Sequence, residues 1–487
     1  MQRLTAAQQH YPHRPVRVLQ FGEGNFLRAF VDHMIDIANE QGLFDGSIVA
    51  VKPIRFGTLD TFHEQDCRYT VILRGLEQGK PVEKTRLVSA LSDAVDAYTE
   101  YGKYAGFAKL ETLRFIVSNT TEAGIVLDET DTFAMEPPNS FPGKLTKFLF
   151  ERAEAFNYAA DKGLVMLPVE LIDDNGEQLS RCVHALAQRW QLGERFITWL
   201  DEACVFTSTL VDRIVTGYPK DETQALWQRL GYEDRLLVTA EPFGLWVIQS
   251  QKDISGELPL DKCGLPVVFT NDQKPYKQRK VRILNGAHTS FVPAAFLCGH
   301  DTVLEAMRDP LILGFMKHTL YDEVIPTLTL PKEDLYQFAE AVISRFENPY
   351  IKHALLAICL NAVSKWRARC MPSLLAYEEN TGKLPEHLVF SLATMLALYQ
   401  DGELRDNTLA CVRDGKPYSL QDDAPVLRFF AENKGQSAEV LTSRFLARED
   451  FFGQDLTRIN GLEAYVSEAL VEIREHGMRS VLAQRFS

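Results

Sequence analysis

Three side chains in residues 280–288 have the types and spacing needed to move a proton at a carbonyl group. The segment reads Lys-Val-Arg-Ile-Leu-Asn-Gly-Ala-His, so Lys280, Asn285 and His288 form a Lys-x4-Asn-x2-His array. On an α-helix that turns by about 100° per residue, Asn285 lies about 140° and His288 about 80° round from Lys280. One broad face of a helix can therefore present all three side chains to one ligand.

The chemistry that suits this array is carbonyl reduction or its reverse, in which hydride moves at carbon and a proton moves at oxygen. Lys280 can supply the proton only if its pKa falls from about 10.4 towards the working range. Five of the nine residues from Lys274 to Arg282 are basic and none is acidic. Crowded like charges lower the pKa of an amine and attract an anionic substrate. On spacing alone, a water-facing basic turn before an ordinary helix remains the alternative.

Length and composition limit the class of protein. The chain has 487 residues, and after residue 275 its β-branched strands and turns give way to helical periodicity. We therefore expect two domains, residues 1–275 and residues 276–487. A formal net charge of −14 argues against a nucleic acid or an acidic membrane as partner.

The cysteines and the N-terminus bear on the compartment. The eight cysteines show no zinc-binding spacing, which is typical of free thiols in a reducing environment. The N-terminus has no apolar signal region, and no stretch of 18 apolar residues occurs. We expect a cytoplasmic protein without a membrane span, either a monomer or a small homo-oligomer.

A glycine turn follows the first expected strand, residues 17–21. Gly22-Glu23-Gly24 leads into a helix with apolar residues at positions 26, 30, 34 and 37. A strand, two glycines and a helix form the layout of a dinucleotide-binding turn, in which N–H groups at the helix start receive a pyrophosphate. Leu27 occupies the place of the third glycine, so an ordinary strand–helix turn is an equally good interpretation of this motif alone.

Further strands are expected at residues 47–51, 113–117 and 164–168. The second strand ends in Lys52-Pro53-Ile54-Arg55, where many NAD enzymes carry an acid for the ribose, so the residues leave NAD and NADP open. A polar loop at residues 118–124 follows the third strand, and ligands of open α/β sheets bind at such ends. Near residue 208 an apolar stretch contains Asp212 and Arg213, which we interpret first as a structural brace because buried charges need partners.

The second half carries apolar residues at helical spacing over residues 304–316, 351–363, 388–399 and 462–473. Asn348 and Pro349 have the residue types of a helix N-cap and first turn, so we predict that the 351–363 helix begins there. A second basic cluster contains Lys365, Arg367 and Arg369. We interpret Arg367 and Arg369 as a water-facing surface, with contact between one of the two basic clusters and an acidic substrate in a cleft between the domains as the alternative.

Taken together, these motifs resemble the mannitol dehydrogenase family of polyol-specific long-chain dehydrogenases. The resemblance runs over nearly the whole chain, through residues 20–30, 118–125, 208–217, 280–289 and 348–353. The sequence Phe-Gly-Glu-Gly-Asn-Phe is closer to the branch that acts on tagaturonate than to the fructuronate or mannitol branches. The resemblance implies an α/β fold, in which an N-terminal Rossmann-type domain precedes a mainly α-helical C-terminal domain and the active site lies in the cleft between them.

The activity that the resemblance implies is metal-independent reduction of D-tagaturonate to D-altronate by NADH in hexuronate breakdown. Lys280 would donate the proton in reduction, Asn285 would polarise the carbonyl oxygen, and His288 would bind a substrate hydroxyl. The implied cofactor-binding residues are Val18, Leu19, Gln20, Phe21, Gly22, Glu23, Gly24, Asn25, Phe26, Leu27, Arg28, Ala29, Asn119, Thr120, Thr121 and Glu122. Candidate substrate-binding residues are Glu170, Asp173, Asp212, Arg282, Lys352, His353 and Lys365.

One departure from the family pattern concerns the substrate site. The mannitol branch has a second carbonyl-polarising Asn where this chain reads Glu170-Leu171-Ile172-Asp173, and no Asn aligns there. A carboxylate near the reacting oxygen would oppose negative charge on it unless it is neutral or faces a hydroxyl. Fructuronate reductase or another polyol or uronate dehydrogenase of the family stays open, and a non-catalytic sugar-acid or nucleotide sensor is the remote alternative.

Overall fold

The computed structural model describes residues 2–6, 12–77, 79–121 and 123–486. It divides into two compact units. The first comprises Met1–Gly75 and Pro81–Gln273, and the second comprises Leu76–Lys80 and Lys274–Ser487. Each unit has its own hydrophobic interior.

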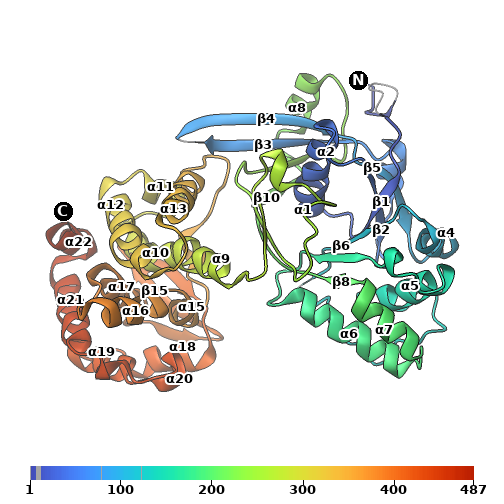
Figure 1. Cartoon of the computed structure of the whole chain (residues 1–487). Coiled ribbons are helices and arrows are strands. Elements are labelled where there is room, and N and C mark those ends of the chain that lie inside the picture. The colour runs from blue at the N-terminus through green and yellow to red at the C-terminus, as the bar shows by residue number, and fades with distance from the viewer. Residues whose placement is uncertain (1, 7–11, 78, 122, 487) are drawn as a thin grey trace. The chain divides into compact units, whose positions relative to one another are not determined.

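The first unit contains most of the strands (Figure 1). Its strands are β1 (Val16–Phe21), β2 (Ser47–Lys52), β3 (Tyr69–Glu77), β4 (Lys80–Val88), β5 (Leu91–Asp96), β6 (Phe115–Ser118), β7 (Val165–Pro168), β8 (Val205–Phe206), β9 (Ser208–Asp212), β10 (Val215–Gly217), β11 (Val238–Ala240), β12 (Leu245–Gln249) and β13 (Val267–Thr270). Its helical segments are α1 (Asn25–Leu27), η2 (Arg28–Asp32), α2 (His33–Glu40), α3 (Asp60–Glu64), α4 (Tyr101–Gly106), η3 (Phe107–Lys109), α5 (Phe141–Ala155), η4 (Ala160–Lys162), α6 (Asn175–Arg189), α7 (Glu194–Ala203), α8 (Thr223–Leu230) and η5 (Asp261–Cys263).

A six-stranded parallel sheet organises this unit, with strand order β5-β2-β1-β6-β7-β8. This is the 3-2-1-4-5-6 order of a doubly wound nucleotide-binding fold. The order reverses between β1 and β6, so the loops after these two strands lie at the switch point. Ligands of such sheets bind there, and both predicted cofactor segments begin there.

The sheet is buried on both faces, because successive side chains of its strands point to opposite sides. Val18 belongs to a core with residues of the helix after β1, such as Phe30 and Met34. Leu19 and Phe21 belong to a second core, to which α5, α6 and α7 contribute. The predicted Rossmann-type fold and its four predicted sheet strands are confirmed, with boundaries shifted by up to two residues.

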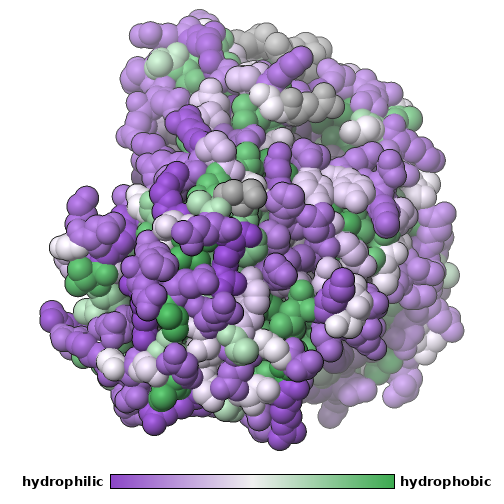
Figure 2. Space-filling model, turned by 90° about the vertical axis from the view of Figure 1, so that its left-hand side faces the viewer, coloured by the Kyte–Doolittle hydropathy of each residue, from purple (hydrophilic) through white to green (hydrophobic). Residues whose placement is uncertain are grey.

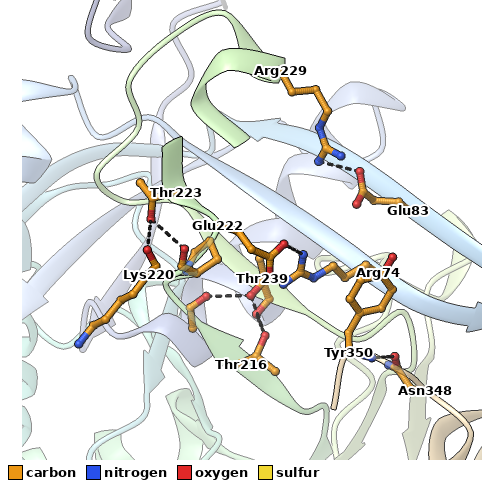
Figure 3. Close-up of polar contacts among 12 residues, drawn as sticks. Arg74, Glu83, Thr216, Lys220, Glu222, Thr223, Arg229, Thr239, Asn348 and Tyr350 are labelled. Atoms are coloured by element: carbon orange, nitrogen blue, oxygen red, sulfur yellow. Dashed lines mark hydrogen bonds and ion pairs between the residues drawn. The ribbon is translucent and has the colours of Figure 1, made fainter. Parts of the chain in front are cut away.

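A smaller sheet, β10-β11-β3-β4, packs beside the main one. Figure 3 shows how side chains tie α8 to it: Arg74 on β3 makes a bidentate ion pair with Glu222, at 2.6 and 2.8 Å. Arg229 on α8 reaches Glu83 on β4 at 2.7 Å. The hydroxyl groups of Thr216 and Thr239 lie 2.6 Å apart across β10 and β11.

The second unit is mainly helical, as predicted (Figure 1). Its segments are α9 (Lys274–Arg279), η6 (Lys280–Asn285), α10 (Gly286–Leu297), α11 (Val303–Met307), α12 (Pro310–His318), η7 (Thr319–Val324), η8 (Ile325–Thr327), α13 (Lys332–Phe346), α14 (Leu355–Ile358), α15 (Ala362–Arg369), α16 (Met371–Thr381), α17 (Glu386–Tyr399), α18 (Ala424–Glu432), α19 (Ala438–Leu446), α20 (Glu449–Phe452), η9 (Leu456–Arg458), α21 (Leu462–His476) and α22 (Met478–Phe486). Strands β14 (Glu403–Arg405), β15 (Thr408–Arg413) and β16 (Lys416–Leu420) form an antiparallel sheet.

Two almost fully buried helices, α10 and α17, pack against each other at the centre of this unit. On the face shown in Figure 2, hydrophilic side chains predominate and hydrophobic ones lie in small groups. No helix in the described part of the chain is both long and apolar enough to span a membrane. All eight cysteines are free, and six of them are buried.

The predicted helix over residues 351–363 is wrong. Asn348 does not cap a helix: its side-chain oxygen accepts a hydrogen bond from the N–H of Tyr350, at 3.0 Å, and closes a tight turn (Figure 3). Residues 351–353 have no regular secondary structure, and Ala354 forms an isolated bridge with Thr302. Only the short helices α14 and α15 occupy the rest of the region, since Asn361 adopts a left-handed conformation between them.

Candidate active site

The glycine turn after β1 lies at the switch point of the sheet. Gly22 has φ +121°, and a Cβ atom there would lie 3.1 Å from the carbonyl oxygen of Asn119. Any other residue would therefore be strained at this position. Gly24 precedes the helix in an extended conformation, and a Cβ atom there would meet nothing within 4 Å. The turn is thus tightly packed at Gly22 and open at Gly24.

The twelve predicted cofactor residues from Val18 to Ala29 divide into buried and open groups. The side chains of β1 and those of the helix from Leu27 onwards are buried. Arg28 belongs to the buried group, since its guanidinium donates to the carbonyl of Leu236 and, at 2.6 Å, to the side-chain oxygen of Asn25. Only residues 23–26 are half-buried or exposed, so direct ligand contacts from this segment would come from the turn.

The loop after β6 lies beside the glycine turn. The N–H of Asn119 donates to the carbonyl of Phe21, at 3.1 Å. Buried Glu170 fixes this loop: one carboxylate oxygen accepts from the N–H and the hydroxyl of Thr120, both at 3.0 Å, and the other accepts from the hydroxyl of Ser118, at 3.1 Å. The structure thus brings two predicted cofactor segments together. Glu122 lies outside the described residues.

Of the two basic side chains at the end of β2, Lys52 is paired within the protein and Arg55 is open to water. The Lys52 ammonium group is buried, lies 3.0 Å from a carboxylate oxygen of Asp96 and donates to the carbonyl of Ile54, at 2.7 Å. Its charge is therefore neutralised within the protein. Arg55 is exposed, with its guanidinium 5.1 Å from the ring centre of Tyr98.

The Lys-Asn-His array of the second unit begins in a π-helical turn. Residues 280–285 form η6, and the N–H of Gly286 donates to the carbonyl of Val281, five residues earlier. In a π turn, side chains four and five residues apart fall on one side of the helix, so Asn285 follows Lys280 more closely than an α-helix would allow. His288 follows three residues after Asn285 in α10, so its side chain lies about 60° back round the helix axis from Asn285, towards Lys280. The three side chains therefore share a narrower face than we predicted.

His288 lies between aromatic rings and cations. Its ring stacks on Phe346, with centroids 4.0 Å apart, and meets His353 edge-on at 5.4 Å. Its Nε2 atom is buried and has no hydrogen-bond partner among the described residues. Burial lowers the pKa of His288 well below its ordinary value, and the positive charges of His353, Arg345, Arg369 and Lys365 act in the same direction. His288 is therefore neutral at neutral pH.

The predicted substrate residues fall in different surroundings. In the second unit, Lys365 donates to the carbonyl of Ile358 at 3.1 Å, and it lines with His288 a small cavity of about 10 Å³. His353 and Arg282 are half-buried, and burial lowers the pKa of both, whereas Lys352 is exposed.

In the first unit, Asp173 is exposed and Asp212 is buried at the end of β9. Arg213, next to Asp212, donates to the backbone carbonyls of Ala29, Phe243 and Pro242. Arg213 thus braces the chain, whereas the role of Asp212 stays a prediction. Among the described residues, no group of three or more His, Cys, Asp or Glu side chains is arranged to hold a metal ion.

Sequence reasoning missed the position of Arg369. Its guanidinium donates to the hydroxyl of Thr289, at 3.3 Å, one residue beyond His288. Arg369 is half-buried, whereas Arg367 is exposed as expected. Their sequence contains a signal that separates them: Arg369 is four residues after Lys365, which places these two on the same side of a helix.

Comparison with known proteins identifies the family. Residues 16–262 match the mannitol dehydrogenase Rossmann domain, and residues 272–474 match the mannitol dehydrogenase C-terminal domain. Similar curated proteins include altronate oxidoreductases of Yersinia enterocolitica, 47% identical over 476 residues, and of Escherichia coli, 47% identical over 475 residues. Each similarity covers 96% of this chain and 96% of the relative.

Solved structures agree on the fold. A substrate-free D-sorbitol dehydrogenase superposes with a TM-score of 0.80 at 22% identity, covering 99% of this chain and 100% of that one. A Pseudomonas fluorescens mannitol 2-dehydrogenase, solved with NAD and D-mannitol, superposes with a TM-score of 0.66 at 22% identity, covering 99% and 96%. The parallel sheet, the helical second unit and these similarities lead to one conclusion: the chain belongs to the mannitol dehydrogenase family of oxidoreductases.

Proposed function

We propose that this protein is a cytoplasmic enzyme that reduces D-tagaturonate to D-altronate with NADH, reversibly and without a metal ion. The observation that carries the proposal is the end-to-end similarity to proteins named altronate oxidoreductase, at 47% identity over 96% of the chain. Fructuronate reductase and other uronate or polyol dehydrogenases of the same family are the alternatives that an assay must separate.

The first unit would bind the dinucleotide at the switch point. The open space at Gly24 fits a pyrophosphate, which the N–H groups at the start of the following helix would receive. Asn119, Thr120 and Thr121 would flank the nicotinamide, with Glu170 holding that loop in place. The ion pair between Lys52 and Asp96 supports NADH, because it removes Lys52 as a partner for a 2′-phosphate and leaves Arg55 as the open cation at this strand end.

The second unit would supply the proton-transfer groups. When bound, the reduced nicotinamide supplies the hydride for the carbonyl carbon. Lys280 donates its proton to the carbonyl oxygen as that oxygen gains negative charge, and the Asn285 side-chain amide donates a hydrogen bond to the same oxygen. His288, neutral and with an unmet hydrogen bond at Nε2, binds a neighbouring substrate hydroxyl. In the oxidative direction Lys280 accepts the proton.

Spectrophotometric assay of purified protein tests the proposal, with NADH and NADPH each supplied against D-tagaturonate, D-fructuronate and D-fructose. We expect rapid consumption of NADH with D-tagaturonate and slow or no reaction with the other pairs. Turnover of fructuronate or fructose in preference to tagaturonate would reassign the substrate. No turnover with any of the three would refute the enzyme and favour the sensor.

A further inference from the structure

Helix α15 carries two cations on one side. Lys365 and Arg369 are four residues apart and both half-buried, while Arg367 between them is exposed. Buried Trp366 anchors the helix, since its ring N–H donates to the hydroxyl of Ser391 at 2.8 Å. The direction in which Lys365 and Arg369 point is therefore set by packing.

Arg369 is joined to the helical turn that carries the Lys-Asn-His array. Its guanidinium donates to the hydroxyl of Thr289, and this hydroxyl donates to the carbonyl of Asn285, at 3.0 Å. The backbone packs equally closely: a Cβ atom at Gly286 would lie 3.3 Å from the carbonyl oxygen of Arg369. The backbone of Arg369 thus lies beside Gly286, and its guanidinium reaches Thr289, one helical turn beyond Asn285.

These two cations have no ion-pair partner among the described residues, although the charge of Asp422 acts favourably on Lys365. Lys365 donates to a backbone carbonyl and Arg369 to a hydroxyl, and neither forms an ion pair with a described carboxylate. Burial lowers the pKa of both side chains, which reflects the cost of holding a partly desolvated charge. A bound anion would offset that cost.

We propose that Arg369, assisted by Lys365, binds the carboxylate of the sugar acid and selects acids over neutral ketoses. This inference rests on the proposed function, because it names the group that recognises the far end of that substrate. In D-tagaturonate four carbon–carbon bonds separate the ketone from the carboxylate, about 5 Å in an extended chain with bonds of about 1.5 Å. One helical turn rises about 5.4 Å, so a ketone at Asn285 leaves the carboxylate level with Thr289 and Arg369.

Arginine also binds a carboxylate better than the nearby side chains of Lys352 and His353 would. Its planar guanidinium binds a carboxylate through two parallel hydrogen bonds, which fixes orientation as well as charge. Lys352 is exposed to water, and burial lowers the pKa of His353, which makes it a weaker cation than Arg369. Arg369, by contrast, keeps its charge and is hydrogen-bonded to Thr289, the residue after His288.

Two ketoses that differ at one carbon test the proposal. D-Tagatose carries a CH2OH group where D-tagaturonate carries the carboxylate. For Arg369→Met we expect kcat/KM for D-tagaturonate to fall by about 100-fold, mostly through KM, as for loss of a charge-assisted pair. The low activity on D-tagatose should change by less than about 3-fold. Arg369→Lys should recover part of the loss, and Arg367→Met, on the exposed side of the same helix, should match the unmodified protein.

Calorimetric titration with D-altronate and with its uncharged analogue D-altritol separates this inference from the proposed function. If the unmodified protein turns over no keto acid, the proposed function fails. The inference then still requires that it bind altronate more tightly than altritol, and that Arg369→Met abolish the difference. Equal losses for charged and neutral ligands in Arg369→Met, or an unchanged preference for the acid, would overturn the role of Arg369.

Discussion

Glu170 offers a direct test of how the sheet holds its cofactor loop. The carboxylate is buried and accepts three hydrogen bonds, two from Thr120 and one from Ser118, at 3.0 to 3.1 Å. Replacement by Ala would leave all three donors without an acceptor. Replacement by Gln would keep an oxygen for both donors of Thr120 and offer an N–H group to the hydroxyl of Ser118.

The magnitude follows from these contacts. Hydrogen bonds to a charged group each contribute about 1.5–3 kcal/mol, partly offset by the cost of burying the charge. We therefore expect Glu170→Ala to destabilise the loop by about 3–5 kcal/mol, and the affinity for NADH to fall by at least about 10-fold. Glu170→Gln should stay within about 3-fold of the unmodified protein.

The pH dependence of the stability of Glu170→Gln provides an independent prediction. Burial raises the pKa of Glu170 above its ordinary value. As the pH rises past the pKa that Glu170 has in the unfolded chain, Glu170 ionises in the unfolded chain before it ionises in the folded protein. The stability of the folded protein therefore falls until the pH passes the raised pKa of Glu170 in the folded state. Glu170→Gln lacks this loss, so its stability relative to the unmodified protein should increase with pH over that window.

Fluorescence titration with NADH measures the affinity, and urea unfolding at several pH values measures the stability. Equal damage from Glu170→Gln and Glu170→Ala would mean that the negative charge itself is required, as for a residue that contacts substrate. Unchanged NADH affinity in Glu170→Ala would refute the loop-holding role.

Four further changes have definite expected results. Lys280→Ala should lower kcat by about 10² to 10⁴-fold with NADH affinity unchanged in titrations; lost affinity with intact turnover would contradict the role of Lys280. Gly22→Ala should destabilise the protein by about 1–3 kcal/mol in urea unfolding, because of its positive φ and the nearby Asn119 carbonyl. Gly24→Ala should leave the free energy of unfolding within about 0.5 kcal/mol but weaken NADH binding. Lower stability with unchanged NADH affinity would exclude the approach of a phosphate to Gly24. Burial raises the pKa of Asp32 to about 7 from 3.8, so the stability of Asp32→Asn relative to the unmodified protein should grow by about 3 kcal/mol from pH 4 to pH 7. A constant difference would contradict the raised pKa.

The sheet was predictable because its signal is local. A short apolar run followed by glycines or polar residues marks a strand end, and the four predicted strands occur where this pattern occurs. The same reasoning failed at Asn348, whose side chain caps a turn instead of a helix. Both arrangements use an Asn oxygen that accepts an N–H group two or three residues later, so residue type alone does not distinguish them.

Roles that depend on a distant partner were not predictable. Glu170 reads as an acid at a strand end, and only the fold brings Ser118 and Thr120, some 50 positions earlier, onto its carboxylate. Arg369 reads as part of a charged run on a helix surface. Its bond to Thr289 spans 80 positions in the chain, and no local pattern reports it.

In the Lys-Asn-His array, the angle between side chains depends on the type of helix as well as on their spacing in the sequence. In an α-helix, Lys280 and Asn285 would diverge by about 140° and frame a wide surface. The π turn η6 adds a residue to the turn and brings Asn285 round towards Lys280. A π turn has poorer backbone hydrogen bonding than an α turn, and such turns recur at functional sites. We infer that the π turn and the five-residue spacing act together. They direct the ammonium group of Lys280 and the amide of Asn285 towards a single oxygen atom.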